Sequence, residues 1–263
     1  MKDTKLRVAA ASVRGQSHRT ENTPCQDAVF EERSSYLSGV CVADGAGSCV
    51  ASHIGARITT EWTARYVRRE FAAMFEEPDA GSSKLLIDLK HHLTSEAALC
   101  GCKPSDLSCT LMFAFAETRR REVRYLCGNL GDGVILMQQN GITEILMDAD
   151  NGEFANQTWF VTSSDANTHF RVCTGSCPVE SLPGWLLATD GAWPFLYRRS
   201  SGTVARAAQS LLEDVRTATP RRSQIALSSF LENMIIPRSS DDCSIALLQT
   251  IAHGRHISRR PIV

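Results

Sequence analysis

The stretch VCVADG at residues 40–45 is the most informative segment of the sequence, because it joins an apolar run to an acidic turn. The apolar run that ends at Ala43 predicts a strand, and the chain delivers Asp44 where that strand ends. Gly45 follows, and a glycine at this place lets a main-chain oxygen come close to whatever the carboxylate binds. A single Asp-Gly pair is usually only a turn, so the interpretation depends on finding the pattern again.

The pattern recurs in WLLATDG at residues 185–191, where Asp190 and then Gly191 follow a second apolar run. Further aspartates occur elsewhere in the chain, and no group of histidines or cysteines with metal-ligand spacing accompanies them. Carboxylates of this kind suit Mg²⁺ or Mn²⁺ and do not suit zinc. Drawn into one cleft without a cation, they would repel one another strongly. The residues therefore predict a hard-metal site, for which the further candidates are Asp27, Asp132, Asp241 and Asp242.

Hydrophobic spacing predicts strands and helices in an irregular order. Helices are expected at residues 50–75, 84–98, 202–216 and 223–234. Strands are expected at residues 6–13, 37–43, 108–115, 122–127, 134–139, 142–147, 158–162, 170–173, 185–188 and 243–249. Asn140-Gly141 predicts a tight hairpin, since both residues tolerate a positive φ. The order favours packed sheets with helices outside and excludes a helical bundle.

Composition narrows the class of protein. The 263 residues carry 28 basic and 29 acidic side chains, a balance that does not indicate a nucleic-acid partner. No apolar run approaches the roughly 18 residues of a membrane helix, and the polar N-terminus makes a poor signal peptide. We therefore expect a cytoplasmic protein with no membrane partner. The ten cysteines contain no C-x-x-C pair, and free thiols in a reducing compartment are the better interpretation.

Six segments in order resemble the metal-dependent protein phosphatases of type 2C, in particular the small bacterial members. Each motif is weak alone, and together they span about residues 8–250. The segments are SVRG (12–15) through QD (26–27), VADGAG (42–47), SCTL (108–111), GNLGD (128–132), LATDG (187–191) and DDCS (241–244).

The resemblance implies an α+β fold, a four-layer α/β/β/α sandwich of two antiparallel sheets flanked by helix pairs. We expect one phosphatase-like catalytic domain over residues 1–252, and we interpret residues 253–263 as a basic and flexible tail. Two Mn²⁺ or Mg²⁺ ions are expected to activate a bridging water that attacks phosphoserine or phosphothreonine in a protein substrate. A protein kinase that the phosphatase opposes is the expected partner.

The resemblance also assigns roles to single positions. Asp44 would bridge the two metals, and the Gly45 carbonyl oxygen would bind one of them. Asp190 and Asp241 look like ligands of one metal, and Asp27 like the residue that holds metal-bound water. Asp132 matches a weaker third-metal site. Asp242 replaces the family's asparagine and is expected to add a carboxylate to the metal set.

The phosphate-binding arginine of the family has no direct counterpart, because Asn22 stands at its position. The loop around it is longer than usual, so Arg19, His18 or Arg14 could take the role. Arg19 is the preferred candidate, since a guanidinium grips phosphate bidentately.

Two other functions stay open at this point. The missing arginine favours a pseudophosphatase, a regulatory or scaffold protein of the same fold, although four aspartates are retained. Another metal hydrolase, such as a phosphodiesterase or nuclease, would often include histidine ligands, and the seven histidines fit no ligand spacing. A cysteine-dependent phosphatase is excluded, because no arginine lies six residues after any cysteine.

Overall fold

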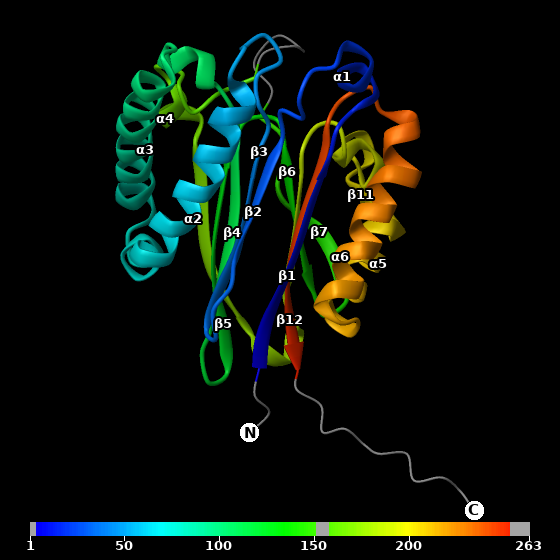
Figure 1. Ribbon diagram of the computed structural model, residues 1–263. Coiled ribbons are helices and arrows are strands. Elements are labelled where there is room, and N and C mark those ends of the chain that lie inside the picture. Colours follow the sequence, from blue (N-terminus) through cyan, green and yellow to red (C-terminus); the bar gives the residue numbers. More distant parts are fainter. Residues whose placement is uncertain (1–3, 151–157, 253–263) are drawn as a thin grey trace, which may run out of the picture.

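Two antiparallel sheets of five strands each pack face to face, with helices on both outer faces (Figure 1). The computed structural model describes residues 4–150 and 158–252. One sheet has the order β2-β3-β4-β5-β8, formed by Ala28–Glu32, Leu37–Ala43, Leu111–Thr118, Glu122–Leu130 and Arg171–Pro178. The other has the order β1-β12-β9-β6-β7, formed by Thr4–Val13, Cys243–Ala252, Gly184–Ala188, Val134–Gln139 and Ile142–Met147.

Two pairs of helices complete the four layers. Helices α2 (Ser52–Glu76) and α3 (Pro78–Cys100) flank the first sheet, and α5 (Arg206–Thr217) and α6 (Pro220–Phe230) flank the second (Figure 1). Shorter elements are α1 (Gln16–Glu21), α4 (Ala166–His169) and the small hairpin of β10 (Tyr197–Arg198) and β11 (Thr203–Val204). No helix of the described chain is long and apolar enough to cross a membrane. The predicted α+β sandwich is confirmed.

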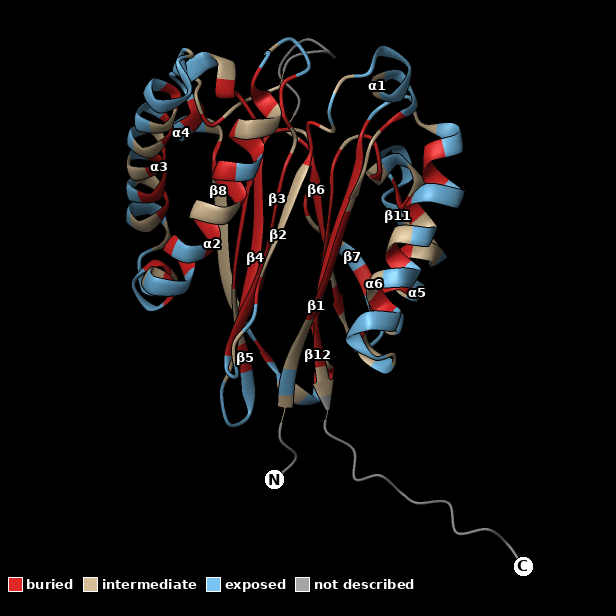
Figure 2. Ribbon diagram, viewed as in Figure 1, coloured by how far each residue is buried: buried red, intermediate tan, exposed pale blue. Residues whose placement is uncertain are grey.

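The two-residue period of the strands separates three cores. In β3, Val40 and Val42 pack into the core between the sheets, whereas Cys41 and Ala43 pack against the helices α2 and α3. Successive side chains of a strand point to opposite faces, and both faces of this sheet are covered. Figure 2 shows the consequence, because the central strands are buried along most of their length and the helices only along one side.

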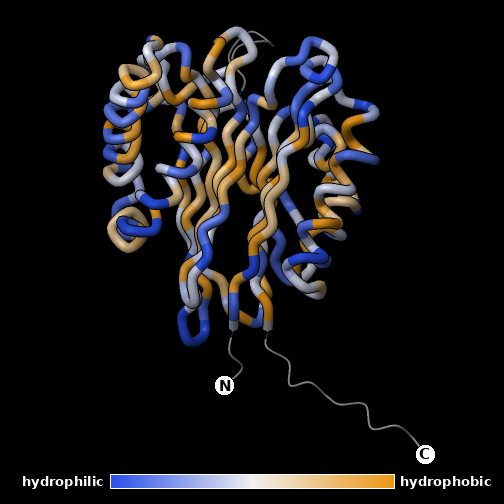
Figure 3. The backbone as a smooth tube through the Cα atoms, in the orientation of Figure 1, coloured by the Kyte–Doolittle hydropathy of each residue, from blue (hydrophilic) through white to orange (hydrophobic). Residues whose placement is uncertain are grey.

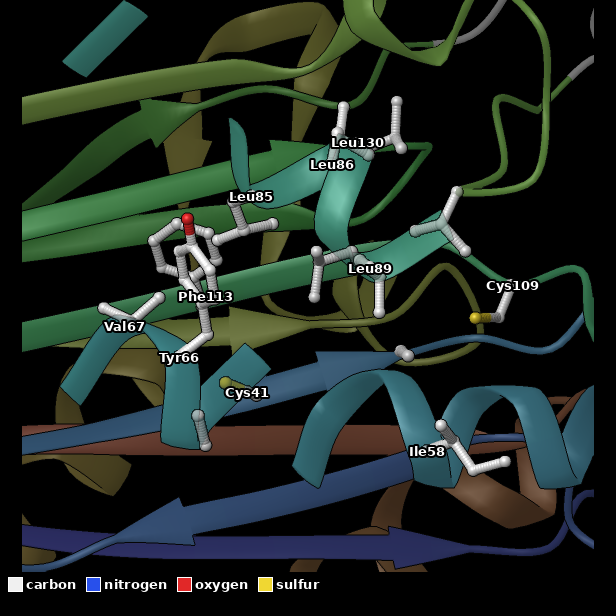
Figure 4. Packing of buried hydrophobic residues seen from close by; sticks show 14 of the residues in the cluster. Cys41, Ile58, Tyr66, Val67, Leu85, Leu86, Leu89, Cys109, Phe113 and Leu130 are labelled. Atoms are coloured by element: carbon white, nitrogen blue, oxygen red, sulfur yellow. The ribbon is translucent and has the colours of Figure 1, made fainter. Parts of the chain in front are cut away.

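The helices of the outer layers are amphipathic and pack their apolar sides against the sheets. Leu85 and Leu89 of α3 pack toward Phe113 of β4, in a cluster that Tyr66 of α2 also joins (Figure 4). Figure 3 shows apolar residues concentrated along the strands and polar ones over the loops and the outward sides of the helices.

The ends of strands β3 and β9, which precede the candidate site residues, lie at one end of the sandwich. Strand β3 ends at Ala43 opposite Ala28, the first residue of β2. Strand β9 ends at Ala188, opposite Val134 at the start of β6 and close to the start of β12. The turns that follow these strands therefore meet at the end of the molecule where α1 lies (Figure 1).

Several sequence predictions are confirmed, and one is wrong. The Asn140-Gly141 turn has positive φ at both residues, 52° and 79°. The predicted strand at residues 158–162 is instead a loop, in which Trp159 stacks on His169 with ring centroids 3.7 Å apart. The apolar spacing there reflects this local stacking and the burial of Val161, not pairing with a sheet. The spacing also missed α1 and β2, which contain few apolar residues or are short. The predicted tail at residues 253–263 lies outside the described residues.

Candidate metal centre

An acidic cleft of about 330 Å³ opens at the end of the sandwich where the strands β3, β5 and β9 end. Asp44 follows β3, Asp132 follows β5 and Asp190 follows β9. One carboxylate oxygen of each of the three lies within 4.8 Å of the others, close enough to share a cation. Asp44 and Asp190, almost 150 positions apart in the sequence, thus lie close together because both sheets have strand ends at this end of the sandwich.

The turn that carries Asp44 is fixed by the neighbouring strand. The Asp44 N–H donates to Thr110 Oγ1 over 2.9 Å, and the Thr110 N–H donates back to the Asp44 carbonyl over 2.8 Å. A Cβ atom at Gly45 would lie 2.8 Å from the Gln26 carbonyl oxygen, so only glycine fits between these two segments. Gly45 itself lines the cleft, as a carbonyl ligand requires.

Asp27 lies beneath the same site and is 7% exposed. Thr189 Oγ1 donates to its Oδ2 over 2.9 Å, while its Oδ1 is buried without a hydrogen-bond partner in the protein. It does not line the open cleft, although its charge acts on Asp44. Its hydrogen bond to Thr189 and its effect on Asp44 suit a group that supports the three clustered carboxylates without lining the cleft.

Charge repulsion in the cleft is strong. Burial, followed by repulsion from neighbouring carboxylates, raises the pKa of Asp44 and of Asp27 well above the ordinary range. Burial together with the charges of Asp132 and Asp241 raises the pKa of Asp190 to about 6. Burial also raises the pKa of Asp132, which accepts a hydrogen bond from Thr158 Oγ1. A divalent cation relieves this repulsion directly.

The two adjacent aspartates before β12 have different environments. Asp241 lines the cleft and is exposed. Asp242 is 2% exposed, and its Oδ1 and Oδ2 accept the N–H groups of Gly15 and Gln26 over 2.7 and 2.6 Å. Both oxygens of Asp242 therefore accept hydrogen bonds from the backbone of the loop 15–26, and Asp242 does not line the cleft. This placement differs from the role of metal ligand expected from the sequence.

The three candidate phosphate-binding residues are also placed differently from one another. Arg19 Nη2 donates to both carboxylate oxygens of Glu232 on the surface, over 2.8 and 2.9 Å, and Arg19 does not line the cleft. Arg14 donates to the Thr23 carbonyl over 3.3 Å and is likewise absent from the cleft. His18 does line it, with Nδ1 2.9 Å from Asp242 Oδ2 but without the alignment of a hydrogen bond.

Some residues of the site were not predicted. Thr110, Thr158 and Thr189 position Asp44, Asp132 and Asp27 through their hydroxyl groups. Thr110 and Thr189 lie in the SCTL and LATDG motifs, so the motifs carried a signal, but the role of each hydroxyl depends on a contact with a distant segment. Phe160, which also lines the cleft, gave no signal because it was assigned to a strand.

The fold and the cleft define a two-sheet α/β/β/α protein with a carboxylate centre that suits divalent cations. Residues 14–232 match the family described as Protein phosphatase 2C. Because the match covers most of the sequence, the chain belongs to the protein phosphatase 2C family.

Similar proteins agree with this assignment. Serine/threonine-protein phosphatase 3 of Escherichia coli (strain K12) is 25% identical over 192 residues, which cover 70% of this chain and 73% of that protein. The structure of PstP/Ppp from Mycobacterium tuberculosis matches with a TM-score of 0.61 at 13% identity, over 93% of this chain and 98% of the other. The structure of PppA from Pseudomonas aeruginosa matches with a TM-score of 0.57 at 19% identity, over 95% and 99%. At these identities the structures support the fold alone.

Proposed function

We propose that this chain hydrolyses phosphoserine and phosphothreonine esters in proteins, with two Mn²⁺ or Mg²⁺ ions bound in the acidic cleft. The observation that carries the proposal is the convergence of Asp44, Asp132 and Asp190 within 4.8 Å in a protein of this family. A structure of the PstP catalytic domain, which shares this fold, is described in complex with two manganese ions.

The residues present fit such ions. Asp190 Oδ1 and Asp27 Oδ1 are buried and accept no hydrogen bond from the protein, which leaves them available to a cation or to its water. The donor set is entirely oxygen, as Mg²⁺ and Mn²⁺ prefer. We assign Asp44, Asp190, Asp241 and the Gly45 carbonyl to the two principal ions, Asp132 to a weaker third site, and Asp27 to a water-holding role.

When bound, the ions activate a water and neutralise charge on the phosphoryl group. The chain contributes the rest. Asp27, held by Thr189 and buried, offers a carboxylate oxygen that can orient and accept a hydrogen bond from a water below the cleft. The ten cysteines are all free and none lines the cleft, so no cysteine nucleophile is needed.

His18 is our candidate for the group that contacts the phosphate. Its Nδ1 lies against Asp242, which leaves Nε2 to face a phosphoryl oxygen in the cleft. Arg19 would first have to leave Glu232, with which it forms two short contacts. We therefore favour His18 over Arg19 and Arg14, and we propose that Asp242 orients the loop that carries it.

A pseudophosphatase is the less favoured alternative. A protein of this kind would be expected to lose carboxylates or to fill the cleft, whereas here the three clustered carboxylates line an open cleft and Asp27 remains beneath it.

The natural substrate and location are further proposals. The substrate expected of this family is a protein phosphorylated by a protein kinase that the phosphatase opposes. In cells without this chain, phosphorylation of the targets of the opposing kinase should therefore rise. Unchanged phosphorylation would argue against an opposing kinase. The free state of all ten cysteines supports a reducing compartment such as the cytoplasm, and fractionation of cells would test it.

Turnover of a chromogenic aryl phosphate and of a phosphothreonine peptide tests the activity, with Mn²⁺, with Mg²⁺ and with EDTA. We expect metal-dependent hydrolysis that falls by about 100-fold or more in Asp44→Asn. Asp165→Asn removes an exposed carboxylate outside the cleft and should leave the rate unchanged. Turnover in EDTA would overturn the metal mechanism, and a folded chain that binds Mn²⁺ without turnover would indicate a pseudophosphatase.

A further inference from the structure

Two cysteines face each other across the pair of strands β5 and β8, away from the acidic cleft. Cys127 and Cys173 are direct partners in the antiparallel register. Cys127 lies in the core between the sheets, and Cys173 packs against that same core, so both side chains point to the same face.

The geometry of opposed residues suits a covalent bond. Directly opposite residues of antiparallel strands have Cα atoms about 4.5–5.5 Å apart, and disulfides span Cα distances of about 4.4–6.8 Å. A bond between these two sulfurs therefore requires side-chain rotation and little movement of the backbone.

The neighbouring Cys177 is excluded from the pair by Tyr125. Cys177 lies on the same face of β8 as Cys173, but its partner in β5 is Val123. Tyr125 stands between the two positions, opposite Gly175, and its ring fills the space where a Cβ atom of residue 175 would lie. The aromatic ring thus separates Cys177 from Cys127 and directs Cys127 to Cys173.

The two thiols differ in accessibility. Strand β8 is an edge strand of its sheet, and Cys173 is partly exposed there, whereas Cys127 has no exposed surface. Interaction with the Cys127 thiol lowers the pKa of Cys173, while burial raises the pKa of Cys127 well above its usual value. Cys173 is thus both the more accessible and the more readily ionised of the two, which are the properties that favour reaction with an oxidant.

We propose that Cys127 and Cys173 form a reversible disulfide when the protein meets a peroxide. The Cys173 thiolate attacks one peroxide oxygen, which becomes the sulfenic acid oxygen, and the other leaves as hydroxide and takes up a proton to become water. Cys127 then attacks the sulfenic sulfur, the S–S bond forms, and a second water leaves with the thiol proton. A small dithiol returns both cysteines to the reduced state by exchange.

This site has no residue in common with the metal centre. The bond would fasten the edge strand β8 to β5 near Asn129, whose side-chain amide donates to the Gly133 carbonyl across the turn that carries Asp132. Oxidation would therefore modify β5, the strand that leads to the cleft, and would leave the carboxylates of the cleft unmodified.

Peptide mapping of the full chain tests the proposal. After treatment with hydrogen peroxide, free thiols are alkylated in denaturant and the chain is cut with trypsin. Cleavage after Arg124, Arg171 and Arg198 places Cys127 in one peptide and Cys173 with Cys177 in another. We expect the two peptides to be linked, with the loss of two hydrogen masses, and to separate after treatment with dithiothreitol.

Variants identify the sulfur atoms. Cys173→Ser, at the partly exposed edge, should abolish the linked peptide, and Cys127→Ala should do the same. Cys177→Ser is the matched control on the same strand and should retain the link. The proposal is overturned if the native chain yields no link, or if the link persists in Cys173→Ser and disappears in Cys177→Ser.

Discussion

Asp190 has a buried carboxylate oxygen that accepts no hydrogen bond, among neighbours of the same charge. Its ordinary pKa of 3.8 is raised to about 6, so the ionised form that a metal needs destabilises the metal-free fold at neutral pH. Function and stability therefore make opposite demands on this side chain.

Asp190→Asn tests that conflict. We expect the variant to lose metal-dependent hydrolysis while its metal-free form gains roughly 1–3 kcal/mol of unfolding free energy near pH 7.5, because a charge repelled by its neighbours is removed. Urea unfolding in EDTA measures the gain. A metal-free variant that is less stable than the parent would contradict the electrostatic explanation.

His18 and Arg19 are adjacent, but only His18 lines the cleft. We expect His18→Ala to lower kcat/KM for a phosphothreonine peptide by about 10–100-fold, since it removes a donor to the phosphoryl group. Arg19→Ala should change it by less than about threefold, because an exposed pair with Glu232 contributes little. Steady-state kinetics decide between them, and the opposite ranking would restore Arg19 as the phosphate ligand.

At the scale of elements, the loop 15–26 is held by a side chain from the far end of the sequence. Asp242 accepts two backbone N–H groups of this loop, at Gly15 and Gln26, in a buried setting. The loop contains α1 and leads directly into Asp27, so its position determines part of the site.

Replacing Asp242 with alanine leaves those two N–H groups without an acceptor. We expect Asp242→Ala to lose about 2–4 kcal/mol of unfolding free energy in the metal-free protein. Its neighbour provides the control, since Asp241 is exposed and Asp241→Ala should cost less than about 1 kcal/mol while reducing Mn²⁺ affinity. Equal losses in denaturant unfolding would show that Asp242 does not hold the loop.

A second element depends on close backbone packing. Gly55 lies inside α2, where a Cβ atom would overlap with the Leu107 backbone carbonyl of the 3₁₀ turn Pro104–Leu107. Gly-to-Ala changes in a helix usually stabilise it by about 1 kcal/mol.

Here we expect the reverse, a loss of about 1–3 kcal/mol for Gly55→Ala, because α2 and the turn must separate. Ser95→Ala on the exposed side of α3 is the control and should change stability by less than about 0.5 kcal/mol. Thermal unfolding compares the stability of the two variants. A Gly55→Ala variant that is more stable than the parent would show that α2 and the turn can separate at little cost.

At the scale of the whole molecule, metal binding and protonation compete for the same carboxylates. Between pH 3.8 and about 6 the folded chain holds more protons at Asp190 than the unfolded chain does. This group therefore makes the metal-free protein less stable as the pH rises through that window. A cation bound to the native state acts in the opposite direction.

We expect Mn²⁺ to raise the Tm, and to raise it more near pH 7.5 than near pH 5.5, where protons compete at Asp190. Scanning calorimetry at both pH values, with and without EDTA, measures the difference. The Asp190→Asn variant should lose most of it. An equal rise at both pH values would mean that Asp190 does not bind the ion.

Most of the strands and the chemical nature of the site follow from local sequence patterns. Apolar runs that end in Asp44-Gly45 and Asp190-Gly191 are local patterns. Residues 40–43 are all apolar, so the division of their side chains between two cores appears only in the structure. The Asn140-Gly141 hairpin was equally predictable, because its turn needs only the φ preferences of two adjacent residues.

The tertiary structure alone decided which side chains serve the site. Asp242 and Asp241 are adjacent in sequence, yet one is buried against the loop 15–26 and the other faces the cleft. Arg19 satisfied every local criterion for a phosphate ligand, but Glu232, 213 residues away, holds it at the surface. The direction of a side chain depends on partners from distant segments, and no local pattern contains those partners.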